Sequence, residues 1–159
     1  MKTIIVIAAA LIATSASAQH RFGSRSEPLI ERDLAGVAKY VYDGDQVRLR
    51  KERLTFRLMG LNAPEMKSIC QNPEAKAVEQ RAAVKARDRL RQLVNHPTAR
   101  LSEVLCHGSN FGRRCGIVKV EGIDVATIMI RENLAEPFTC GSKGCTRRRD
   151  WCQTAITPQ

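Results

Sequence analysis

Residues 37–65 read VAKYVYDGDQVRLRKERLTFRLMGLNAPE, a pattern of short strands joined by polar turns. Apolar and polar residues alternate before and after the DGD sequence at 43–45, which is a typical β-hairpin turn. A second turn at 51–53 leads to a third strand. In that strand Phe56 and Leu58 share one face, so Arg57 is expected to point to the other. The stretch therefore predicts three consecutive strands.

The pattern changes from strands to a helix after Pro73. Two further strands are predicted over 99–105 and 116–120, and a short helix over 125–132 ends at Asn133, which suits a left-handed cap. We therefore expect an α+β domain. Its architecture would be a five-stranded OB-fold barrel with a long helix between strands 3 and 4 and a short helix after strand 5. Apolar residues at helical intervals predict the buried side of the long helix, and they are Ala75, Val78, Ala82, Ala86, Leu90 and Leu93.

The N-terminal residues have the pattern of a secretory signal peptide. Lys2 supplies a positive charge, residues 4–12 form a short apolar run, and residues 16–18 form a small-residue cleavage site. The alternative is a membrane anchor, but the run is shorter than the roughly 20 residues that span a bilayer. We expect a signal peptide over 1–18, a flexible segment over 19–35, a folded domain over 36–138 and a basic, cysteine-rich tail over 139–159 packed on the domain. No regular structure is assigned from residue 137 onward.

Composition limits the class of protein to which the chain can belong. It has 159 residues, 43% of them hydrophobic, and 26 Lys and Arg against 16 Asp and Glu, a net charge of +10. This excludes a disordered chain and a multi-span transporter, and it fits a single domain. Without residues 1–18 the charge is +9, because Lys2 is lost. Such a balance attracts polyanions.

Six cysteines in an exported chain favour disulfides. No spacing gives the two close pairs of a tetrahedral zinc site. We expect a bridge between Cys106 and Cys115 across a polar loop. Cys70 is expected to pair with one member of a C-terminal trio, for which metal binding is the alternative; the trio is Cys140, Cys145 and Cys152.

Acidic and basic residues gather near neighbouring strand ends. Asp43, Asp45 and Glu65 lie in loops, and Arg57 lies between them in the third strand. Carboxylates suit hard cations such as Ca²⁺ or Mg²⁺, and guanidinium groups match phosphate oxygens. Together they are what attack of water on a phosphodiester requires. Structural interpretations stay open, because DGD is a common turn and the sequence NAPE at 62–65 can begin a helical turn.

In order and spacing, these residues resemble the staphylococcal nuclease (thermonuclease) family. The similar segments are VYDGD at 41–45, FRLMGLNAPE at 56–65, FGR at 111–113 and the run 122–135. The resemblance covers roughly 36–138 and implies a nuclease-like OB-fold domain. It also implies that Arg57 and Arg113 hold and polarise the scissile phosphate and that Glu65 is the general base that activates water.

The same resemblance implies a calcium site. Asp45 corresponds to a direct ligand, Asp43 to a carboxylate that supports the metal loop, and Ala63 to a position that ligates through its backbone carbonyl. Asn62 stands where well-known members carry a second ligating aspartate. Asparagine still offers a carbonyl oxygen, but one negative charge is lost, so a weaker site or a different cation is expected.

Other departures concern nucleic-acid contacts. Phe111 replaces a common tyrosine, Asn110 replaces a lysine, and Thr139 falls where a stacking tyrosine is expected. Aromatic residues make up only 4% of the chain. Base stacking is therefore expected to be poorer than in the type member of the family.

The leading expectation is an exported, monomeric nuclease that uses Ca²⁺ or another divalent cation such as Mg²⁺. It would hydrolyse phosphodiester bonds of DNA and RNA with low sequence specificity, preferably in single strands, in the periplasm or outside the cell, with no membrane association after signal cleavage. One alternative is a catalytically weakened module of this fold that binds nucleic acid or other polyanions. Another is a disulfide-stapled interaction domain that uses the basic sequence RRR at 147–149.

Overall fold

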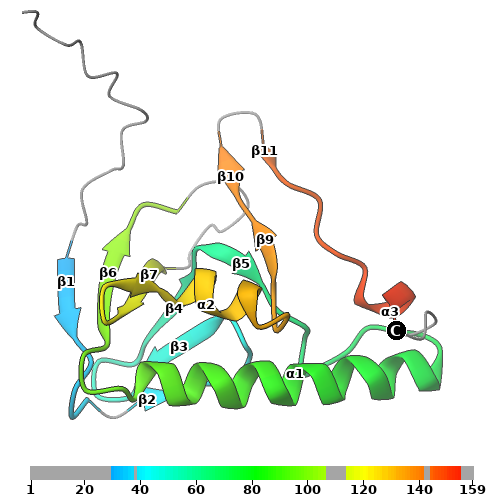
Figure 1. Cartoon of the computed structure of the whole chain (residues 1–159), viewed down its shortest axis with the longest axis horizontal. Coiled ribbons are helices and arrows are strands. Elements are labelled where there is room, and N and C mark those ends of the chain that lie inside the picture. Colours follow the sequence, from blue (N-terminus) through cyan, green and yellow to red (C-terminus); the bar gives the residue numbers. More distant parts are fainter. Residues whose placement is uncertain (1–29, 38, 107–113, 142–143, 155–159) are drawn as a thin grey trace, which may run out of the picture.

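The computed structural model describes residues 30–37, 39–106, 114–141 and 144–154. These residues form a mixed α+β fold in which a curled sheet lies over one long helix, α1 (Figure 1). The predicted signal peptide, most of the predicted flexible segment and Arg113 lie outside the described residues. None of the described helices is long and apolar enough to cross a membrane.

The main sheet has seven strands among the described residues, where the sequence predicted five strands in all. Neighbouring strands are antiparallel except β4 and β7, which are parallel. The order is β1 (Ile30–Asp33), β6 (Arg100–Val104), β7 (Arg114–Val120), β4 (Leu54–Leu58), β3 (Gln46–Leu49) and β2 (Lys39–Tyr40), with β8 (Ile123–Asp124) also paired to β7. Two separate pairs complete the strands: β5 (Gly60–Asn62) with β9 (Glu136–Phe138), and β10 (Cys140–Gly141) with β11 (Gly144–Cys145).

Helix α1 (Pro73–Val94) begins and ends where its local sequence dictates. The Asn72 side chain caps its N-terminus by accepting hydrogen bonds from the backbone N–H groups of Glu74 (2.8 Å) and Ala75 (3.2 Å). Pro73 occupies the first turn, where a missing N–H costs nothing. Asn95 ends the helix, and its backbone N–H bonds to carbonyls of the last turn.

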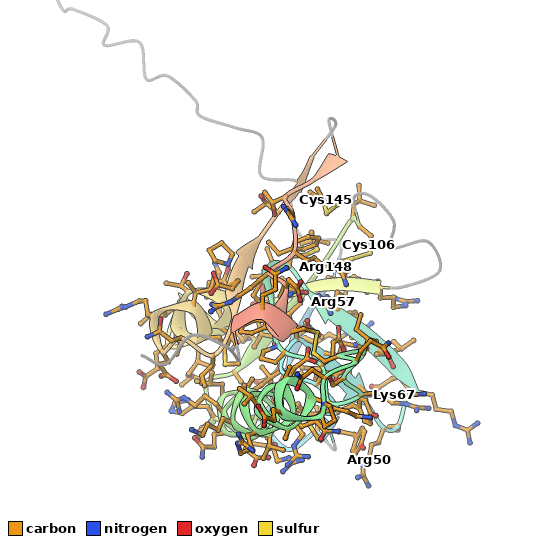
Figure 2. All side chains as sticks on the ribbon, turned by 90° about the vertical axis from the view of Figure 1, so that its right-hand side faces the viewer. Arg50, Arg57, Lys67, Cys106, Cys145 and Arg148 are labelled. Carbon is orange, nitrogen blue, oxygen red and sulfur yellow. A yellow bond between two sulfur atoms is a disulfide. The ribbon has the colours of Figure 1, made fainter. Side chains whose placement is uncertain are left out.

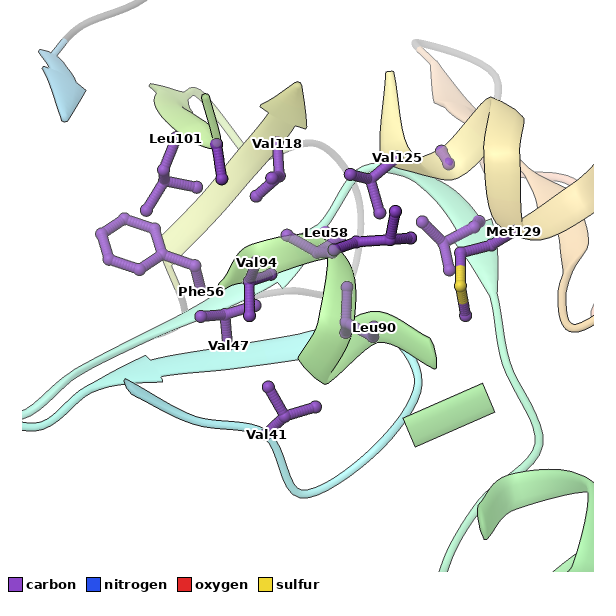
Figure 3. Packing of buried hydrophobic residues seen from close by; sticks show 14 of the residues in the cluster. Val41, Val47, Phe56, Leu58, Leu90, Val94, Leu101, Val118, Val125 and Met129 are labelled. Carbon is purple, nitrogen blue, oxygen red and sulfur yellow. The ribbon is translucent and has the colours of Figure 1, made fainter. Parts of the chain in front are cut away.

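Helix α2 (Val125–Arg131) follows β8 directly and is capped by the Asp124 side chain, which accepts from the Ala126 N–H at 2.8 Å. Asn133 has a φ of 57°, the left-handed conformation that the sequence predicted. Both helices cover the same core. Figure 3 shows Leu90 and Val94 of α1 and Val125 and Met129 of α2 facing apolar residues of the sheet.

Two segments contain more secondary structure than the sequence predicted: residues 30–35 and the tail from residue 136 onward. Strand β1 pairs with β6, and Leu34 is fully buried, so residues 30–35 belong to the fold and not to a flexible segment. The tail contains β9, β10, β11 and the short helix α3 (Trp151–Thr154). Its segments are too short to carry a periodic pattern, and the partner of β9, strand β5, lies far away along the chain, which is why the sequence predicted no regular structure from residue 137 onward.

Three disulfides join the six cysteines. Cys106 pairs with Cys115, and Cys70 pairs with a member of the C-terminal trio, Cys152, which confirms both expectations. Cys140 pairs with Cys145. With all three of its cysteines in disulfides, the C-terminal trio is not a metal site. The Cys70–Cys152 bridge closes a sequence separation of 82 and fastens α3 beside the start of α1.

Gly44 allows the loop before β3 to lie against α1. A Cβ atom at this position would come within 2.7 Å of the Cβ atoms of both Ala63 and Ala86, which is closer than packed carbon atoms approach. We predict that Gly44→Ala lowers the free energy of unfolding by about 1–3 kcal/mol, the usual cost of overpacking. Urea denaturation followed by circular dichroism measures it.

The matched control is Gly141→Ala, because a Cβ atom there would meet nothing within 4 Å. Equal stability losses in the two variants would contradict the packing role of Gly44.

Candidate functional site

A tight loop before β3 brings two aspartates into the interior. Asp43 is 4% exposed and Asp45 is 1% exposed. Asp43 accepts hydrogen bonds from the Met66 backbone N–H (3.3 Å) and from the Gln46 side chain (3.0 Å). Asp45 Oδ2 accepts from the Ala63 N–H at 3.3 Å. The loop is therefore tied to the segment that follows β5.

Arg57 lies in β4, and strand alternation points its side chain away from Phe56, as the sequence predicted. It is nevertheless only 5% exposed. One terminal nitrogen of its guanidinium lies 2.5 Å from Asp45 Oδ2, and the other donates to Asn62 Oδ1 at 3.2 Å. The loop before β3 and strand β5 thus fix the orientation of the Arg57 guanidinium.

Glu65 lies in the segment after β5. It is close to a buried acidic residue, Glu79, that the sequence analysis did not single out. Its backbone N–H donates to Glu79 Oε1 of α1 at 3.4 Å. Glu79 is 4% exposed, and its other oxygen lies 3.2 Å from Cys70 Sγ, which has no hydrogen to donate because it is in a disulfide. A signal existed in the sequence, since Glu79 is four residues from both Ala75 and Ala83, which are buried in α1.

The acidic groups of the site are electrostatically coupled. Burial raises the pKa of Asp45 from 3.8 to about 6, while Arg57 and the Ala63 N–H act in the opposite direction and Glu65 and Asp43 raise it further. Burial also raises the pKa of Asp43, against the effects of the Met66 N–H and Arg57. The carboxylates of Asp43, Asp45 and Glu65 therefore share one region of low polarity.

Glu65 has a raised pKa as well. Burial is the main cause and the charge of Asp43 adds to it, whereas the guanidinium groups of Arg57 and Arg148 lower it. The influence of Arg148 is informative, because this residue comes from the C-terminal tail. Sequence reasoning treated the tail arginines only as a surface for another partner.

The donor atoms fit a hard cation. Asp45 Oδ1 is buried and has no hydrogen-bond partner among the described residues, so one carboxylate oxygen has lost water without compensation. Residues next to Asp45, or tied to it through Arg57 or the Ala63 N–H, carry further oxygen donors: the Asp43 carboxylate, the Asn62 amide oxygen and the Ala63 carbonyl. The Asn62 oxygen also accepts from Arg57, so it has one lone pair left.

A second cluster contains residue types that often bind metal ions, but it is not suited to hold a cation. Cys70, Glu79 and Cys152 place potential ligand atoms within 4.8 Å of one another. Both sulfurs belong to one disulfide, so neither offers a thiolate.

The structure brings together six of the seven residues that the sequence singled out. Hydrogen bonds, the Arg57–Asp45 ion pair or charge coupling connect all of them, and they are Asp43, Asp45, Arg57, Asn62, Ala63 and Glu65. The seventh, Arg113, lies outside the described residues.

Comparison with known proteins adds no relative: no family model matches the chain, and no curated protein matches it. The resemblance to thermonucleases therefore rests on the sequence motifs alone.

The raised pKa values predict how stability depends on pH when divalent cations are removed. Below about pH 3.8 Asp45 is protonated in both states, and between 3.8 and about 6 it holds its proton only in the folded state. The free energy of unfolding should therefore fall as pH rises through this window, by about 3 kcal/mol from Asp45 alone. Urea denaturation in a chelator from pH 4 to 7 measures the slope.

Asp45→Asn should flatten that slope, whereas Asp88→Asn, which changes an exposed surface ion pair, should not. If the slope of the wild type persists unchanged in Asp45→Asn, the assignment of the titration to Asp45 is wrong.

Proposed function

We propose that this protein is an exported nuclease that hydrolyses phosphodiester bonds of DNA and RNA with low sequence specificity. The observation that carries the proposal is the convergence of Arg57, Asp45 and Glu65 from three separate segments. The motif resemblance to thermonucleases supports it, and so does the net charge of +9 that remains without residues 1–18, which attracts polyanions of any sequence.

We further propose that the curled sheet with α1 is an OB-fold barrel of the thermonuclease type. In this arrangement β3, β4 and β5 precede the long helix and β6 and β7 follow it. The three disulfides suit an oxidising compartment, the periplasm or the extracellular space, in agreement with the predicted signal peptide. A monomer is proposed.

Each residue has a role in the proposed hydrolysis. Glu65 accepts a proton from water as the water oxygen forms a bond to phosphorus, and the bond from phosphorus to the leaving oxygen breaks, with a proton then passing to that oxygen. The raised pKa of Glu65 improves its efficiency as a base near neutral pH. Arg57, already oriented by Asp45 and Asn62, stabilises charge that builds on the phosphoryl oxygens. Arg113 is proposed as a second arginine with that task.

The proposed cofactor is Ca²⁺ or another divalent cation such as Mg²⁺, held by Asp45 with support from Asp43, Asn62 and the Ala63 carbonyl. When bound, it supplies Lewis acidity to the phosphate and lowers the pKa of water. Asp45 Oδ1, which is buried without a partner among the described residues, supports this assignment.

A specific observation favours the second candidate, a weakened module that binds single-stranded nucleic acid without cleaving it. Arg57 already has a carboxylate partner at 2.5 Å and is almost completely buried, so a substrate phosphate has to share or replace that partner. Asn62 also removes one acidic ligand. Binding in a chelator with no turnover at any cation concentration would select this candidate.

We predict that the protein cleaves a single-stranded oligonucleotide in the presence of Ca²⁺ or Mg²⁺ and not in a chelator. Arg57→Ala and Glu65→Gln should each lower the rate by about 10²–10³, the usual effect of removing one preorganised group. Gel electrophoresis of an end-labelled substrate over a cation series measures the rate.

Arg91→Ala is the control, because Arg91 is exposed on α1 and pairs with Asp88. Absence of cleavage by the folded wild-type protein at every cation concentration would reject the nuclease proposal.

A further inference from the structure

A cavity of about 830 Å³ lies between the segment after β5 and the C-terminal tail. Glu65 lines it, so it is continuous with the candidate site, whereas Arg57 does not line it. Lys67 and Ile69 contribute from the same segment, and Arg148 and Trp151 contribute from the tail. The size is within the range of roughly 300–1,000 Å³ that is typical of ligand sites.

The tail wall of this cavity is held in place from two sides. The Cys70–Cys152 disulfide attaches α3 next to the start of α1. Arg149 forms an ion pair with Glu136 of β9, and its guanidinium lies 4.7 Å from the centre of the Trp151 ring. Arg148 directly precedes Arg149, and two residues before it the Thr146 backbone N–H donates to the Thr139 carbonyl at 2.8 Å, so the chain is held on both sides of Arg148.

Unlike Arg149, Arg148 has a guanidinium group that forms no ion pair among the described residues. Its guanidinium lies 5.1 Å from the centre of the Phe138 ring, a cation–π contact that orients the side chain without using its N–H groups. Among the described residues it has no hydrogen bond or ion pair, and it is exposed. Arg148 and Arg57 both lower the pKa of Glu65, and in the view of Figure 2 the two are drawn on the same part of the molecule, away from Arg50.

We propose that the cavity binds a phosphate of the nucleic acid that neighbours the scissile one, and that Arg148 is the residue that binds it. This inference rests on the proposed function, because only a nuclease has a scissile phosphate. The planar guanidinium presents N–H groups in the geometry that phosphate oxygens accept. Lys67 adds a further cation to the same cavity, beside Arg149, which is ion-paired with Glu136. Because Arg57 does not line the cavity, one phosphate cannot occupy both places.

Binding in the absence of catalysis is the first test. Fluorescence anisotropy of a labelled single-stranded oligothymidylate, in a chelator over a salt series, compares Arg148→Ala with the wild type. We expect about tenfold weaker binding and a fall of about 0.7 in the slope of log affinity against log salt, the value for one lost phosphate contact with a single strand. Arg148→Lys should keep the slope and lose part of the affinity.

Arg50→Ala is the matched control. Arg50 is also exposed and also lies over an aromatic ring, 5.8 Å from the centre of Tyr40, but it does not line the cavity. Its substitution should change neither affinity nor slope. Equal effects of Arg50→Ala and Arg148→Ala would overturn the proposal, because the contribution of Arg148 would then be general surface charge.

Kinetics identify which phosphate Arg148 binds. For an oligonucleotide, Arg148→Ala should raise KM about tenfold. For bis(4-nitrophenyl) phosphate, which has one phosphodiester and no neighbour, KM should not change, and the loss of the Arg148 charge beside Glu65 should shift the pH profile of kcat equally for both substrates. Equal increases in KM for both substrates would overturn the assignment to a neighbouring phosphate. If the wild type binds but never cleaves, the nuclease proposal fails while the anisotropy result still decides whether Arg148 binds phosphate.

The role of the disulfide has its own test. Replacing Cys70 and Cys152 together by Ser releases the tail and should weaken oligonucleotide binding as much as Arg148→Ala, in protein shown by circular dichroism to remain folded. Combining the three substitutions should add no further loss. Wild-type affinity in the folded double variant would overturn the idea that the bridge positions Arg148.

Discussion

The ion pair between Arg57 and Asp45 is the interaction on which the rest of the site depends. Both side chains are nearly inaccessible to water, so each has lost its hydration and needs the other. Removing one partner of such a buried pair costs about 3–5 kcal/mol, because the remaining charge has no compensation. The pair also joins β4 to the loop before β3, which fixes where the neighbouring donors can lie.

Much of this arrangement could be predicted from sequence because it follows from local patterns. Strand alternation placed Arg57 on the face opposite Phe56, the helical period located α1, and the left-handed Asn133 was expected from its position after α2. The disulfide between Cys106 and Cys115 followed from their closeness in a polar loop. These features depend on residues a few positions apart, where propensity and geometry act directly.

Strand pairs between distant segments of the chain could not be predicted. Strand β9 is three residues long and pairs with β5, which precedes it by more than seventy residues, so neither segment carries a recognisable period. Glu79 was missed for a related reason. The predicted buried side of α1 ran through Val78 and Ala82, but the buried side is turned slightly and includes Glu79 and Ala83. The spacing of four residues between Glu79 and Ala75 was the local signal, but an acidic residue at that spacing is more typical of an exposed helix face.

The charge balance of the site explains why a cation belongs to the proposed chemistry. The chain as a whole is strongly basic. At this site, however, the carboxylates of Asp43, Asp45 and Glu65 interact with one buried guanidinium among the described residues of the curled sheet, that of Arg57. An incoming phosphate would add negative charge to a region where burial and neighbouring carboxylates already raise the pKa values of the acidic side chains. A divalent cation at Asp45 reverses that balance, and Arg148 offsets it from the tail. In the proposed function, the basic surface concentrates the polyanion, and the local acids make its cleavage depend on the cation.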